Sequence, residues 1–66
     1  MIAPENKPEV ILLGEDGNAF VVLAKTMKAL RKAGADKEYV ETYKREACAG
    51  DYDHLLQITM QYVDVC

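Results

Sequence analysis

Residues 18–36 read NAFVVLAKTMKALRKAGAD, and the fold that we expect follows from this stretch. Its apolar side chains recur at helical spacing and form one stripe, which consists of Phe20, Leu23, Met27 and Leu30. Asn18, or Asp16 before it, can cap the unpaired amides at the start of the helix. Gly34 can end the helix in a left-handed conformation. The stretch therefore predicts an amphipathic helix that begins at Ala19.

Two further helices are predicted after Gly34. Asp36 can cap a helix over residues 37–49, and the apolar side of that helix consists of Val40, Tyr43 and Ala47. Gly50 should end this helix as Gly34 ends the first, and Asp51 begins a third helix. The inward face of the third helix should consist of Tyr52, Leu55, Leu56, Thr59, Tyr62 and Val63. Links of two or three residues should make neighbouring helices pack as hairpins.

Short strands are expected at both ends of a single domain, residues 9–66. Residues 10–13 are an apolar run between Pro8 and Gly14 that is too short for a helix of its own. The tail at 62–65 alternates apolar and polar residues and could pair with that run, with the helices covering the pair. Residues 1–8 are expected to be a flexible leader. The expected fold class is mostly α, a small α+β domain of three short helices and terminal strands.

The composition indicates a small folded protein and limits which partners and cellular locations we expect. The chain has 66 residues, of which 50% are hydrophobic and 29% charged. Its net charge of −3 works against non-specific attraction to nucleic acid or to an anionic membrane. Cys48 and Cys66 lack the spacing of a disulfide framework, so we expect reduced thiols and a cytoplasmic location. No apolar run approaches the roughly 20 residues that span a bilayer, so we expect no membrane contact.

Four segments of the sequence carry a resemblance to other proteins. They are GEDGNAF at 14–20, ALRKAG at 29–34, GDYDHLL at 50–56 and VDV at 63–65. In these segments the chain resembles a family of small uncharacterised proteins from bacteria and bacteriophages, and the resemblance covers residues 9–65. Where members often have serine before the glycine of the second turn, this chain has Ala49. The resemblance implies a relative but no function, because the members are uncharacterised.

Few residues are suited to catalysis or metal binding. The chain has no serine, and its single histidine, His54, has only Cys48 or Cys66 as a possible nucleophile beside it. Around His54, the side chains of Cys48, Asp51 and Asp53 would give zinc only a partial shell, and capping by Asp51 is the simpler interpretation. We therefore expect no enzyme, no metal and no cofactor.

The turn at 14–18 precedes a helix start, where bare amides can hold a phosphate. It matches neither of the common glycine-rich phosphate motifs, and Glu15 and Asp16 would repel an anion. We interpret it as a turn and helix cap, with ligand binding as the alternative.

Two groups of residues are candidates for contact with a partner. Lys25, Lys28, Arg31 and Lys32 give the first helix a cationic side, which is a solvated face, a nucleic-acid contact or a contact for an acidic protein. The second group is the tyrosines, Tyr39, Tyr43, Tyr52 and Tyr62, which suit the edge of a thin core or an interface. The leading hypothesis is a non-catalytic protein-interaction module or accessory subunit that associates with itself or with a protein partner. The alternative is a nucleic-acid-binding regulator that uses the cationic side of the first helix.

Overall fold

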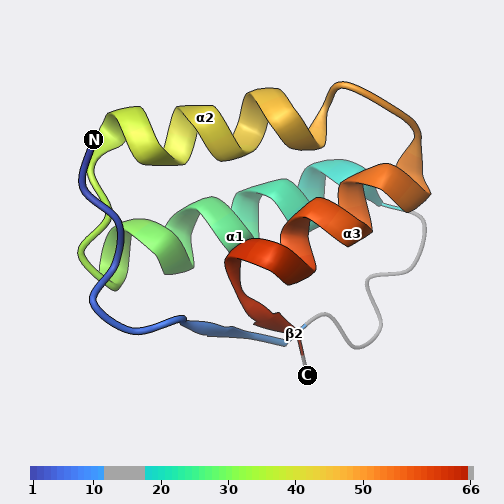
Figure 1. Cartoon of the computed structure of the whole chain (residues 1–66). Helices are drawn as coiled ribbons and strands as arrows, with labels where there is room; N and C mark the ends of the chain where they lie inside the picture. The colour runs from blue at the N-terminus through green and yellow to red at the C-terminus, as the bar shows by residue number, and fades with distance from the viewer. Residues whose placement is uncertain (12–17, 66) are drawn as a thin grey trace.

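Three helices and one pair of short strands make up the fold (Figure 1). The computed structural model describes residues 1–11 and 18–65. The helices are α1 (Ala19–Lys32), α2 (Lys37–Ala47) and α3 (Tyr52–Tyr62), and consecutive helices run in opposite directions. The strands are β1 (Glu9–Val10) and β2 (Asp64–Val65), which pair in parallel. The predicted class, three helices with paired terminal strands, is confirmed.

Each helix begins at a side-chain cap that the sequence predicted. Asn18 accepts a hydrogen bond from the Val21 amide at 3.2 Å. Asp36 and Asp51 accept from the amides of Tyr39 and His54, each at 2.9 Å. Each cap satisfies one amide that the first helical turn leaves without a partner. The helix starts are therefore set by short-range chemistry.

The two glycines after the helices differ in their roles. Gly34 has φ of +108°, as predicted for a residue that ends a helix in the left-handed region. Gly50 has no such conformation, and α2 ends at Ala47 rather than at the predicted residue 49. The expectation that Gly50 ends α2 as Gly34 ends α1 is therefore wrong. A Cβ at position 50 would lie 2.8 Å from Cγ of His54, so glycine is needed there for space.

The core lies where α1, α2, α3 and β1 meet. Its buried apolar residues are Val10, Val22, Leu23, Leu30, Ala35, Val40, Tyr43, Ala47, Leu55 and Val63. The predicted inner face of α2 is confirmed. Of the six residues predicted for the inner face of the third helix, Leu55, Thr59 and Val63 are buried, whereas Tyr52, Leu56 and Tyr62 are only partly buried.

In α1 the predicted stripe is confirmed at Leu23 and Leu30 and is wrong at Phe20. Its buried residues are Val22, Leu23, Thr26 and Leu30, while Met27 is half-buried and Phe20 is 84% exposed. The reason is that α1 contacts β1 as well as the other two helices, and Ala29, which lies two helical turns from Val22 on the same side of α1, lines the groove beside β1. The buried face is therefore rotated away from Phe20.

The strand pair joins residues 9–10 to residues 64–65 beneath α1 and α3, and it does not contact α2 (Figure 1). The register places Glu9 opposite Asp64 and Val10 opposite Val65, and the Asp64 amide donates to the Pro8 carbonyl at 2.8 Å. The first strand was predicted over residues 10–13 and begins at Glu9. Leu12 and Leu13, like residues 14–17 of the predicted turn, lie outside the described residues.

Candidate interaction surfaces

Phe20 lies in the first turn of α1 beside an apolar groove. The groove has a volume of about 260 Å³ and lies between this turn and the link from α2 to α3. Leu23, Ala47 and Leu55 form its buried floor, and Tyr52 contributes to its rim. We call this surface the Phe20 groove. Because the floor comes from three helices, its shape is set by the packing of the whole domain.

Sequence reasoning missed this surface, because Phe20 fits the spacing of a buried stripe. A competing pattern was present in the sequence: Val22, Thr26 and Leu30 follow one another at intervals of four residues. That pattern is the one that the structure buries. The hydroxyl of Thr26 made it look less apolar than the stripe that contains Phe20.

The basic residues of α1 lie on two neighbouring surfaces. Lys25, Lys28 and Lys32 line a second groove, of about 350 Å³, between α1 and β1. Arg31 lies outside this groove, on a surface that it shares with Lys28. The Lys25 ammonium donates to the Ile11 carbonyl at 3.2 Å. Within residues 1–11 and 18–65, no carboxylate forms an ion pair with Lys28, Arg31 or Lys32.

Three of the four tyrosines form a cluster between α2 and α3. The Tyr62 ring meets the rings of Tyr39 and Tyr43 edge to face, with centroids 5.4 and 5.1 Å apart. Tyr43 is wholly buried, and its hydroxyl lies 2.7 Å from that of Thr59. Tyr43 is therefore a core residue that a partner cannot reach in this structure. Of the four tyrosines proposed as interface residues, Tyr52 is the one that lines the Phe20 groove.

The hydroxyl of Tyr62 donates a hydrogen bond to the carboxylate of Glu46. Burial raises the pKa of this hydroxyl above its ordinary value, and the hydrogen bond to Glu46 raises the pKa further. The tyrosine cluster thus connects α2 to α3 by packing and by hydrogen bonds at two hydroxyls, those of Tyr43 and Tyr62.

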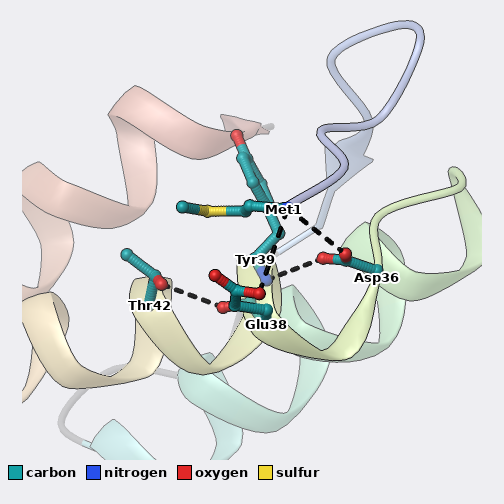
Figure 2. A network of polar contacts seen from close by, with 5 residues as sticks. All are labelled: Met1, Asp36, Glu38, Tyr39 and Thr42. Atoms are coloured by element: carbon teal, nitrogen blue, oxygen red, sulfur yellow. Dashed lines mark hydrogen bonds and ion pairs between the residues drawn. The ribbon is translucent and has the colours of Figure 1, made fainter.

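A polar network joins the start of the chain to the start of α2 (Figure 2). The Met1 amine lies 3.9 Å from the carboxylates of Asp36 and Glu38, and the Asp36 amide donates to the Ile2 carbonyl. The Tyr39 amide, followed by the backbone at Ile2, lowers the pKa of the Asp36 carboxyl. These contacts stabilise the cap of α2 and tie the start of the chain to it.

The histidine has a structural contact. A carbonyl oxygen can only accept, so Nε2 of His54 donates to the Glu46 carbonyl, 2.9 Å away. The Asp51 carboxylate accepts from the backbone amide of His54. In the part of the chain that the structure describes, no three side chains of His, Cys, Asp or Glu are grouped so that they could hold a metal ion.

No helix among the described residues has both the length and the apolar character that crossing a membrane requires. Compared with protein-family models, with curated proteins and with solved structures, the chain matches none of them.

Proposed function

We propose that the protein is a non-catalytic interaction module that binds a protein partner through the Phe20 groove. The observation that carries this proposal is the exposure of Phe20, 84%, directly beside an apolar groove. Burying a phenylalanine side chain stabilises a complex by about 2–3 kcal/mol, and little of that is gained in the isolated domain, where Phe20 is exposed. A large exposed aromatic residue next to a preformed pocket is typical of the centre of an interface.

The chemistry of the groove favours a protein over a nucleic acid. Its floor is aliphatic, and Asp51 at its edge would repel a phosphate. Tyr52 has an apolar ring and a polar hydroxyl, which suits a surface that is exposed to solvent in the free protein and buried in the complex. The partner's contact residues should therefore be apolar: one pocket to receive Phe20 and one side chain to fill the groove.

A second copy of the chain is one candidate for the partner, because the exposed ring and the groove lie on the same surface. In a twofold dimer, each copy would offer both to the other.

Affinity co-purification of the tagged protein from its own cells tests the proposal, at low and high salt and with and without nuclease. The test variant is Phe20→Ser. Met60→Ser is the matched control, because Met60 is an apolar side chain on α3 that is 52% exposed and lies outside the groove. Phe20 and Met60 are both exposed residues, so both variants should fold and keep the circular dichroism spectrum of the parent.

A protein partner that withstands high salt and nuclease should bind the parent and the Met60→Ser variant. Loss of the Phe20 contact should weaken its binding by about 30-fold, the effect of removing a residue worth roughly 2 kcal/mol. Sedimentation of the purified protein shows whether that partner is a second copy. Capture that is equal for all three proteins would refute the proposal. Nucleic acid that is released at high salt would favour the basic residues of α1 instead.

A further inference from the structure

The groove between α1 and β1 combines a cationic rim with an apolar floor. The described lining of this groove contains three ammonium groups, those of Lys25, Lys28 and Lys32, and one carboxylate, that of Glu9. Lys25 already donates to the Ile11 carbonyl, so Lys28 and Lys32 are the ammonium groups that a ligand would pair with. Although the whole chain is acidic, with a net charge of −3, this surface is locally positive. Charges are screened within about 8 Å at physiological salt, so the local sign governs what binds there.

The floor of the same groove is aliphatic. Val10 and Ala29 line it, together with Ile11, whose side chain is 65% exposed. Arginine and aromatic side chains, which bind phosphates and stack on bases, are absent from the described lining of this groove, and Arg31 lies outside it. A ligand that fills the groove should therefore carry carboxylates on one side and small apolar groups on the other.

The backbone of β1 offers a place for such a ligand to lie. The Pro8 carbonyl accepts from the Asp64 amide of β2, so it faces the partner strand. Because backbone groups alternate along an extended chain, the amide and carbonyl of Glu9 point away from β2. The Ile11 carbonyl has the same orientation as Glu9, and it receives the Lys25 ammonium from α1. The edge of β1 that points away from β2 therefore lies on the side of the groove where Lys25 lies.

We propose that this groove binds an extended acidic segment of a partner protein, which lies beside β1. Its carboxylates would pair with Lys28 and Lys32, and its alternate side chains would pack on Val10, Ile11 and Ala29. This is recognition by strand addition, in which the backbone contributes binding and the alternating side chains contribute specificity. The surface is separate from the Phe20 groove, so the two proposals stand independently.

The test measures fluorescence anisotropy of a labelled peptide of alternating glutamate and valine, titrated with the full chain. The comparison probes are the same peptide with lysine in place of glutamate and a single-stranded oligothymidylate. The test variant carries Lys28→Gln and Lys32→Gln. The matched control carries Lys37→Gln and Lys44→Gln, which make the same change in charge at exposed positions of α2.

The acidic peptide should bind the parent and the control variant equally, and the test variant about tenfold more weakly, since an exposed ion pair contributes roughly two- to fivefold in Kd. Ile11→Ser should also weaken its binding, whereas Phe20→Ser should not. The proposal is overturned if the acidic peptide does not bind at millimolar concentration, or if the lysine peptide binds as well. Equal weakening in both double variants, or tighter binding of oligothymidylate than of the peptide, would also overturn it.

Discussion

The hydrogen bond between Tyr43 and Thr59 should contribute a measurable share of the stability of this small domain. Both side chains are wholly buried, and their hydroxyl oxygens are 2.7 Å apart. The Thr59 hydroxyl donates its proton to the Leu55 carbonyl at 2.8 Å, so the Tyr43 hydroxyl must be the donor between the two. The two partners therefore differ in what their removal leaves behind.

Tyr43→Phe removes a donor and leaves the Thr59 hydroxyl bonded to Leu55, which should cost about 1 kcal/mol. Thr59→Val leaves the buried phenol of Tyr43 without an acceptor, which should cost about 1–3 kcal/mol. Both values are large for a domain of this size, whose expected total is roughly 3–5 kcal/mol. Each kcal/mol should lower the melting temperature by about 4–8 °C.

Urea unfolding of the two single variants and the double variant, followed by circular dichroism, forms a complete cycle. Removing both hydroxyls leaves no unpaired phenol, so the double variant should lose less than the sum of the single losses, by about 1 kcal/mol. Additive losses would refute this reasoning. A Thr59→Val variant that is more stable than Tyr43→Phe would contradict the assigned donor.

Three further predictions concern other buried or crowded groups. Among the described residues the buried Thr26 hydroxyl has no hydrogen-bond partner, so Thr26→Val should raise the free energy of unfolding in urea by up to about 1 kcal/mol. A Cβ at Gly50 would meet the His54 ring, so Gly50→Ala should lower that free energy by roughly 1–3 kcal/mol, and adding His54→Ala should restore part of it. The folded pKa of Tyr62 is raised above the ordinary value of 10.0, so the unfolded chain loses this proton first and stability should fall as pH rises above 10.0. Tyr62→Phe should reduce that alkaline loss in urea unfolding, and the late-titrating phenol of Tyr62 should be missing from the tyrosinate absorbance of this variant.

The dependence of binding on ionic strength should distinguish the two proposed surfaces. Binding at the Phe20 groove should depend little on ionic strength, because its floor is apolar. Binding at Lys28 and Lys32 should weaken as salt is added, because both ammonium groups are exposed. If a single partner uses both surfaces, added salt should weaken its binding only in part. In the Phe20→Ser variant the apolar contact is lost, so added salt should weaken the remaining binding strongly.

The sequence was sufficient for the number of helices, their starting points and the inner face of α2. Asn18, Asp36 and Asp51 each bond an amide three residues ahead, so these caps depend only on neighbouring residues. Val40, Tyr43 and Ala47 form a regular stripe, and no competing stripe exists on that helix. Short-range chemistry and helical periodicity are properties of the local chain, and they can be read without knowing what packs against it.

The candidate surfaces depended on contacts between distant parts of the chain. Pairing Glu9 with Asp64 places β1 against α1, and this contact rotates the buried face of α1 toward Val22 and Thr26. The same rotation leaves Phe20 exposed, and β1 places Lys28 and Lys32 in a groove apart from Arg31. Helical spacing alone leaves two possible stripes on α1. The choice between them was made by the tertiary packing, because the free energy of burial depends on which neighbours cover each side chain.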